Sequence, residues 1–169
     1  MNIVFVRHGN DENDKLTKLG KLQAKLVSED LTYENISKIY CSPKNRTLET
    51  AKIIARQLNI KDIIIDERIT EREKKNDTMT KEEIAEFDAN YLNPKFSRKN
   101  PEGGKEYVER IFSFIKSIKK ENPKTSVVLI VGHSSMVYVL LAYMFKSYLK
   151  ENMVWARLGN CSKLCLENV

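Results

Sequence analysis

The sequence predicts an α/β fold, a three-layer α/β/α sandwich whose mostly parallel sheet carries helices on both faces. Two observations support this prediction. Four short apolar runs are typical of buried strands, and stretches with helical spacing of apolar residues lie between them. Strands that alternate with helices form parallel sheets joined by crossover helices. The length of 169 residues suits one compact domain, residues 1–169.

The predicted strands are apolar runs that we expect to be buried on both faces of the sheet. They are residues 3–6, 36–41, 63–65 and 127–131. The tail, residues 162–167, instead alternates between apolar and polar residues. This pattern fits a strand with one covered face, so we expect it at the sheet edge, antiparallel to its neighbour.

Two amphipathic helices are predicted between the first three strands. Thr17 caps the first, because its hydroxyl can accept a hydrogen bond from a free N–H group at the helix start. The expected apolar face of this helix consists of Leu19, Leu22, Leu26 and Val27. Ser42, followed by Pro43, caps the second helix. Its expected apolar residues are Leu48, Ile53, Ile54 and Leu58.

The second half of the chain contains an interruption and two more helices. Residues 72–104 are rich in charged residues, asparagine, proline and glycine, so we expect an insertion or lid there, with a short helix at 81–89. The apolar side of the long helix that follows contains Tyr107, Val108, Ile111, Phe112, Ile115 and Ile118. A final helix begins at Ser134 and extends to about Lys146.

Composition argues against several classes of protein. Three cysteines without CxxC spacing indicate neither a disulfide framework nor a zinc site, so we expect reduced thiols and no metal. No apolar run approaches the roughly 20 residues that cross a bilayer, and no leader pattern opens the chain, so we expect a cytoplasmic protein without a membrane partner. The net charge of +6 permits an anionic ligand. No basic stripe interleaved with aromatic residues predicts nucleic-acid binding.

The only two histidines of the chain both follow predicted strands. His8 comes after the first strand and His133 after the fourth, while Arg7 precedes His8 and Arg46 lies in the first turn after the second strand. The carboxyl ends of parallel strands meet at one edge of a sheet, so these side chains can converge. A phosphoryl group in transfer spreads negative charge over its oxygens, and arginine binds such oxygens in bidentate fashion. The constellation therefore favours a phosphoryl site.

Each of these residues alone has a simpler interpretation. A single histidine after a strand is more often a structural residue, and Arg46 could pair with a carboxylate such as Glu49. Two histidines and two arginines at strand ends together favour a shared anion site over four independent structural roles.

Four sequence motifs strengthen this interpretation. They are R-H-G at 7–9, L-T-x-x-G-x-x-Q-A at 16–24, S-P-x-x-R-x-x-x-T-A at 42–51 and G-H at 132–133. In these motifs and in their order the chain resembles the histidine phosphatase superfamily. The resemblance implies a phosphoglycerate mutase-like fold and a phosphatase that needs neither a metal nor another cofactor.

The resemblance also implies a role for each residue of the site. His8 attacks phosphorus and becomes transiently phosphorylated, while Arg7, Arg46 and His133 hold the phosphate oxygens. A carboxyl group then protonates the leaving oxygen and activates water. In the family this acid follows the third strand in a pattern like D-x-x-L-x-E, which here ends at Glu71. A solvated charged loop is the competing interpretation of that segment.

The loop after the first motif departs from the family. Asn10 stands where the family often has Glu or Gln, and it could donate to a phosphate oxygen or serve as an ordinary turn residue. Only six residues separate Gly9 from Leu16. The sugar-phosphate enzymes of the family carry a longer loop, so this shortening weakens a phosphoglycerate mutase assignment.

The predicted function is hydrolysis of a phosphomonoester through a phosphohistidine intermediate. The expected substrate is a small phosphorylated metabolite, with a phosphoprotein as the second choice. Two alternatives stay open: a phosphomutase that returns the phosphoryl group to a sugar acid, and a non-catalytic module that binds phosphorylated ligands. The sequence does not indicate an oligomeric state.

Overall fold

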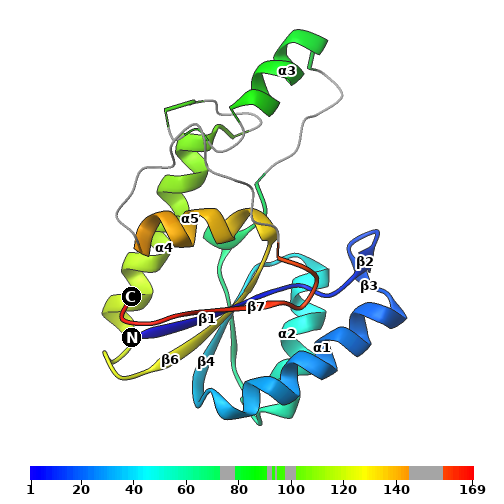
Figure 1. The fold of residues 1–169 in the computed structure, drawn as a ribbon, viewed down its shortest axis with the longest axis vertical. Coiled ribbons are helices and arrows are strands. Elements are labelled where there is room, and N and C mark those ends of the chain that lie inside the picture. The colour runs from blue at the N-terminus through cyan, green and yellow to red at the C-terminus, as the bar shows by residue number, and fades with distance from the viewer. Residues whose placement is uncertain (73–78, 91–92, 94, 98–101, 145–157) are drawn as a thin grey trace.

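The fold is that of a computed structural model centred on a five-stranded sheet (Figure 1). The residues that the structure describes are 1–72, 79–90, 93, 95–97, 102–144 and 158–169. The sheet has the strand order β5-β4-β6-β1-β7. Its strands are β1 (Asn2–Arg7), β4 (Ile36–Cys41), β5 (Ile63–Ile65), β6 (Val127–Gly132) and β7 (Lys163–Leu166).

The sheet is parallel except at one edge. β1, β4, β5 and β6 run in the same direction, and β7 pairs antiparallel with β1, where Val4 lies opposite Cys165. The predicted antiparallel edge strand in the tail is therefore confirmed. The predicted burial of both faces is wrong for β5, because this strand forms the opposite edge and leaves Ile65 55% exposed.

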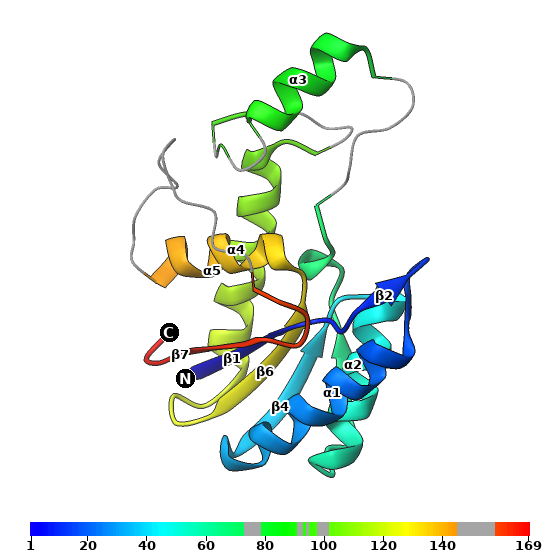
Figure 2. The same cartoon turned by 45° about the vertical axis from the view of Figure 1, so that its right-hand side comes forward.

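Two pairs of helices cover the two faces of the sheet (Figures 1 and 2). The pairs are α1 (Lys18–Asp30) with α2 (Asn45–Gln57), and α4 (Gly104–Glu121) with α5 (Ser134–Met144). The described residues also form two short 3-10 helices, η1 (Leu31–Tyr33) and η2 (Glu67–Ile69). Alternation along β1 sends Val4 into the core beneath α1 and α2, and Phe5 into the core beneath α4 and α5. The predicted three-layer sandwich is confirmed.

Helix α1 exists as predicted but buries a different face. It is capped by Thr17, whose Oγ1 accepts the N–H of Gly20 at 3.1 Å. The predicted apolar face is wrong for Leu19, Leu22 and Leu26, each of which is more than half exposed. The buried residues are Gly20, Ala24, Val27 and Ser28. Small residues face inward because the helix lies against backbone: a Cβ on Gly20 would meet a loop carbonyl oxygen at 2.0 Å.

A short hairpin connects β1 to α1, where the sequence indicated only a short loop. Its strands are β2 (Asp11–Glu12) and β3 (Lys15–Leu16), and its two turn residues are Asn13 and Asp14. Both turn residues have positive φ, 49° and 61°. A two-residue type I′ turn requires this conformation, and Asn and Asp adopt it more readily than most residues. The Asn-Asp pair is therefore the sequence signal for this hairpin.

The start of α2 is capped by the hairpin instead of by Ser42. The predicted Ser42 cap is wrong, because the helix begins at Asn45 and the Ser42 hydroxyl lies 2.8 Å from His133 Nε2. The backbone N–H groups of Asn45 and Arg46 donate to the carboxylate of Asp14, at 3.1 and 3.4 Å. A carboxylate at this position also compensates the positive end of the helix dipole.

The short helix predicted at 81–89 is confirmed as α3 (Lys81–Ala89), which projects beyond the end of α4 (Figure 2). Phe87 of α3 is buried, with its ring centroid 4.3 Å from the guanidinium carbon of Arg72. The amphipathic helix α4 is also confirmed. The role of residues 72–104 as an insertion or lid stays a prediction, since parts of this segment lie outside the described residues, as does the predicted end of α5 near Lys146. Within the described ranges, no helix has the length and apolar character of a membrane span.

Candidate active site

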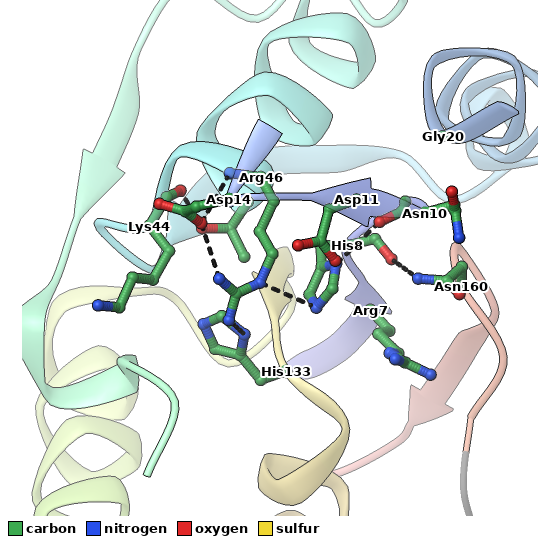
Figure 3. A network of polar contacts seen from close by, with 12 residues as sticks. Arg7, His8, Asn10, Asp11, Asp14, Gly20, Lys44, Arg46, His133 and Asn160 are labelled. Carbon is green, nitrogen blue, oxygen red and sulfur yellow. Dashed lines mark hydrogen bonds and ion pairs between the residues drawn. The ribbon is translucent and has the colours of Figure 1, made fainter. Parts of the chain in front are cut away.

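A polar cavity of about 540 Å³ opens where β1 and β4 end. This is the position at which parallel sheets form their sites. The cavity is lined by Arg7, His8, Asp11, Asp14, Lys44, Arg46, Thr70, Glu71 and Arg72. Every one of these residues carries a charged or hydrogen-bonding side chain. Four of the predicted site residues, Arg7, His8, Arg46 and Glu71, thus line one cavity, and Figure 3 shows the first three of them.

The imidazole of His8 is oriented by hydrogen bonds at both of its ring nitrogens. Nδ1 lies 2.8 Å from the carbonyl oxygen of Gly9, so Nδ1 carries the proton and donates it to this bond. Nε2 accepts the Nε–H of Arg46 at 3.2 Å. Burial lowers the pKa of His8, the bond to Gly9 raises it by less, and the charge of Arg46 lowers it further. His8 therefore keeps an unprotonated Nε2 that faces Arg46 at neutral pH.

The backbone around His8 is fixed from two directions. The N–H of Gly9 donates to Thr50 Oγ1 of α2 at 3.1 Å. The carbonyl oxygen of His8 accepts the Asn160 side-chain amide at 3.1 Å and the Cys161 N–H at 3.3 Å. A residue near the start of the chain is thus held by residues about 150 positions later.

Arg46 connects the hairpin, the Glu71 loop and both histidines. Its Nη1 lies 2.7 Å from Asp14 Oδ1, and its Nη2 lies 2.5 Å from Glu71 Oε2. The same Nη2 is 3.2 Å from His133 Nδ1. The planar guanidinium therefore presents donors in several directions, the arrangement that phosphoryl oxygens require.

His133 lies behind Arg46, and the structure does not place it in the cavity lining. Its side chain is fully buried, and its ring centroid is 5.4 Å from that of His8. Because Nδ1 accepts from Arg46, Nε2 must carry the proton and donate to Ser42 Oγ at 2.8 Å. Burial, together with the charge of Arg46, lowers the pKa of His133 to about 2. His133 is therefore neutral and contacts the site through Arg46.

Glu71 is held at the cavity by a loop that Arg110 of α4 positions. Arg110 Nη1 donates to the carbonyl oxygens of Arg68 at 2.5 Å and Thr70 at 2.8 Å, and the guanidinium also pairs with Glu102. The Glu71 carboxylate faces Arg46 and lies 3.9 Å from His133 Nδ1. The prediction that Glu71 reaches the site is thus supported by its position, and Arg110 is a supporting residue that sequence reasoning missed.

Arg7 and Asn10 differ in how they meet the site. Arg7 lines the cavity, and its Nη1 donates to the carbonyl oxygen of Leu158 at 2.7 Å. Asn10 is not among the lining residues. Its Oδ1 accepts the hydroxyl of Thr17 at 2.7 Å, and its N–H donates to Gln23 at 2.8 Å. The structure therefore brings Asn10 into the turn before α1 and not into the lining of the polar cavity.

Five residues of the cavity escaped the sequence analysis. They are Asp11, Asp14, Lys44, Thr70 and Arg72. Lys44 lies within the S-P-x-x-R motif and Thr70 beside Glu71, so proximity to the motifs was an available signal. Asp11, 3.5 Å from His8 Nδ1, is brought in by the hairpin. Among the described residues, no group of three or more His, Cys, Asp or Glu side chains is arranged to hold a metal ion.

Comparison with known proteins decides the family. Residues 3–167 match the profile described as histidine phosphatase superfamily (branch 1). The chain belongs to the histidine phosphatase superfamily. This membership confirms the predicted family and the phosphatase class of activity that follows from it.

Known proteins and solved structures are similar to this chain over most of its length. A relative from Hydrogenobacter thermophilus, named phosphoserine phosphatase 2, is 28% identical over 157 residues, which span 82% of this chain and 76% of the relative. The structure of Bacillus stearothermophilus YhfR matches with a TM-score of 0.80 and 23% identity, over 98% of this chain and 90% of that chain. A mycobacterial glucosyl-3-phosphoglycerate phosphatase matches with a TM-score of 0.77 and 19% identity, over 97% and 88%. These two structures support the predicted fold.

Proposed function

We propose that this histidine phosphatase hydrolyses phosphomonoesters of small polar metabolites in two transfers, with His8 Nε2 as the nucleophile. One observation carries the proposal: Nδ1 of His8 is bound to the Gly9 carbonyl, which leaves the lone pair of Nε2 directed toward Arg46 and the cavity. A neutral imidazole with this orientation can attack phosphorus without first losing a proton.

In the first transfer, a bond forms between His8 Nε2 and phosphorus while the ester bond from phosphorus to the alcohol oxygen breaks. Glu71 in its carboxylic acid form donates its proton to that oxygen and becomes a carboxylate, and the alcohol leaves. In the second transfer, Glu71 accepts a proton from water as the water oxygen attacks phosphorus. The bond to His8 breaks, inorganic phosphate forms, and both residues return to their starting states.

The cations around His8 stabilise the charge on the transferred group. Arg7, Lys44 and Arg46 all line the cavity, so their positive charges can face the phosphoryl oxygens. His133 contributes through Arg46, because its Nδ1 accepts an N–H of Arg46 Nη2. Neutral His133 adds no charge and fixes the orientation of the guanidinium.

The polar lining supports a small hydrophilic substrate. The cavity of about 540 Å³ has space for a small phosphorylated metabolite, and its charged walls do not favour an apolar leaving group. The Hydrogenobacter relative is named a phosphoserine phosphatase, which makes phosphoserine a reasonable first substrate to test.

The decisive experiment measures turnover and the covalent intermediate together. Purified protein in a chelator should release phosphate from phosphoserine or an activated aryl phosphate, and rapid quenching should trap an acid-labile phosphoryl group. His8→Ala should abolish both signals. Turnover that survives in His8→Ala would contradict the mechanism. Transfer between phosphoglycerate isomers that exceeds phosphate release would support the mutase, and tight binding without an intermediate would support the non-catalytic module.

A further inference from the structure

Asp14 brings a carboxylate to the centre of the proposed phosphoryl site. It is the second turn residue of the β2–β3 hairpin, and it lines the cavity. Its oxygens accept Arg46 Nη1 at 2.7 Å, the Asn45 N–H at 3.1 Å and the Arg46 N–H at 3.4 Å. Figure 3 shows Asp14 beside the Arg46 side chain, with His8 on the other side of the guanidinium.

The groups that Asp14 engages are those that bind anions in proteins. A guanidinium fork and the free N–H groups of a helix start both attract phosphate oxygens. Here a carboxylate of the chain itself satisfies them. Burial raises the pKa of Asp14, but the hydrogen bonds from Asn45 and Arg46 outweigh burial and lower its pKa overall. Asp14 is therefore a carboxylate at neutral pH.

The donors of Arg46 are shared among several acceptors. Its Nε points to His8 Nε2, its Nη1 to Asp14 and its Nη2 to Glu71. A phosphoryl group that reaches His8 Nε2 must approach this guanidinium, because Arg46 Nε lies only 3.2 Å from the nucleophilic nitrogen. The phosphoryl oxygens and Asp14 thus require the same N–H groups.

We propose that Asp14 is an internal competitor for the phosphoryl group, whose carboxylate the phosphoryl oxygens must displace from Arg46. The inference rests on the proposed function, since it assumes that the phosphoryl group binds at His8. The competing carboxylate weakens the binding of both substrate and product phosphate. It also holds Arg46 beside His8 before substrate arrives. It speeds phosphate release because it competes with the product phosphate for the N–H groups of Arg46.

The turn geometry determines which substitutions test this role cleanly. Asp14 has a φ of 61°, and Asn and Gly are the other residues that suit such a position in a type I′ turn. Asp14→Asn keeps an oxygen that can accept the N–H groups of α2 and removes the charge. Asp14→Gly removes the whole side chain and keeps the turn.

Glu12 provides a charge-matched control on the same hairpin. Its side chain is exposed, and it is not among the residues that line the cavity. Glu12→Gln changes the net charge as Asp14→Asn does, without altering a contact to Arg46. The comparison therefore separates competition at the site from a general change in charge.

The experiment measures the affinity of inorganic phosphate by calorimetry and by competitive inhibition, for the wild type and the three variants. We expect phosphate to bind Asp14→Asn and Asp14→Gly about tenfold more tightly, because a neighbouring negative charge is removed. KM should fall in parallel, and kcat should fall because phosphate leaves more slowly. Glu12→Gln should stay within about twofold of the wild type. Unchanged or weaker phosphate binding in folded Asp14→Asn and Asp14→Gly would overturn the proposal.

The two proposals fail in different ways. Phosphate affinity is measured without turnover, so the test of Asp14 does not depend on the nucleophile. If turnover persists in His8→Ala, the proposed function fails whatever the phosphate affinities are. If His8→Ala is inactive and phosphate binding to the Asp14 variants is not tighter, the role of Asp14 alone fails.

Discussion

The ends of β1 and β6 carry the same residue type in opposite settings. His8 after β1 lines the cavity and turns its Nε2 toward Arg46, whereas His133 after β6 is fully buried and turns its Nδ1 toward the same arginine. The partners of the second nitrogen produce this difference. A backbone carbonyl holds Nδ1 of His8, and the Ser42 hydroxyl holds Nε2 of His133.

The comparison shows that position at a strand end does not determine the role of a histidine. Both residues follow neighbouring parallel strands of one sheet at the same register, since Arg7, which precedes His8, lies opposite Gly132, which precedes His133. Both imidazoles are neutral, and the tautomer and the access to the cavity suit His8 to the proposed role of nucleophile and His133 to the support of Arg46. Four experiments can break or sharpen this division of roles.

The largest expected effect separates the two histidines. His8→Asn should lower kcat by about 10⁴-fold or more and abolish the trapped phosphoryl group, because the nucleophile is lost. His133→Asn should lower kcat by roughly 10²-fold and still form the intermediate. Labelling with radioactive substrate and rapid quenching measures both. Equal loss of the intermediate in the two variants would show that the histidines do not divide their roles in this way.

Arg46 is the residue that both histidines contact, so its loss should affect both functions. Arg46→Lys keeps the charge and removes the planar fork, and kcat/KM should fall by about 10²-fold. Steady-state kinetics at several ionic strengths gives the value. Arg56→Lys, at the far end of α2, makes the same change away from the cavity and should leave kcat/KM unchanged. A loss below threefold in Arg46→Lys would indicate that a point charge is sufficient.

Ser42 tests the tautomer of His133 with a smaller change. Ser42→Ala removes the acceptor for Nε2–H and leaves that buried N–H unpaired, so the ring can change its tautomer and release Arg46. We expect kcat to fall about tenfold, with the melting temperature measured as a control. Nitrogen-15 NMR of the His133 ring reports the tautomer directly. An unchanged ring spectrum would contradict the assigned role of Ser42.

The smallest effect concerns stability as a function of pH. Burial lowers the pKa of His133 to about 2 from an ordinary value of 6.5, and it also lowers the pKa of His8. The unfolded chain therefore takes up protons below pH 6.5 that the folded chain refuses. The free energy of unfolding should fall as pH decreases from about 6.5 to 5, by about 1 kcal/mol per pH unit for each histidine that stays neutral.

Variants of the two histidines show which of them causes the change of the free energy of unfolding with pH. His133→Asn should flatten the pH dependence more than His8→Asn, because the pKa of His133 is lowered to about 2. Urea unfolding at a series of pH values, followed by circular dichroism, measures the slope. An unchanged slope in His133→Asn would mean that this ring is protonated in the folded protein.

The sequence predicted the parts of the site that depend on local order along the chain. Strand ends place His8 and Arg46, and each lies in a short motif. Asp14 and Arg110 could not be found in this way, because their roles come from contacts across the fold, such as that of Arg110 with the Thr70 carbonyl 40 positions away. Neither the contact of Asp14 with Arg46 nor that of Arg110 with Thr70 leaves a periodic or spaced pattern in the sequence.

The helices illustrate a second limit of periodicity. The spacing of Leu19, Leu22 and Leu26 correctly indicates a helix, but it cannot tell which face of that helix is buried. Close approach of α1 to backbone at Gly20 requires small residues inward, which sends the leucines outward. In α4 the close approach is at the first residue, Gly104, where a Cβ would meet the Asn93 carbonyl oxygen at 2.3 Å, and Tyr107 further along lies on the buried face as its spacing predicts.

The position of β1 in the sheet has a consequence for the order of events during synthesis. The neighbours of β1 are β6 and β7, whose residues follow it by more than 120 positions, and His8 accepts hydrogen bonds from Asn160 and Cys161. A ribosome adds residues one at a time, so β1 emerges long before its partners do. His8, the proposed nucleophile, is therefore translated long before the residues that complete its surroundings. A nascent chain halted before Asn160 should therefore contain His8 without the two hydrogen bonds that fix its backbone carbonyl.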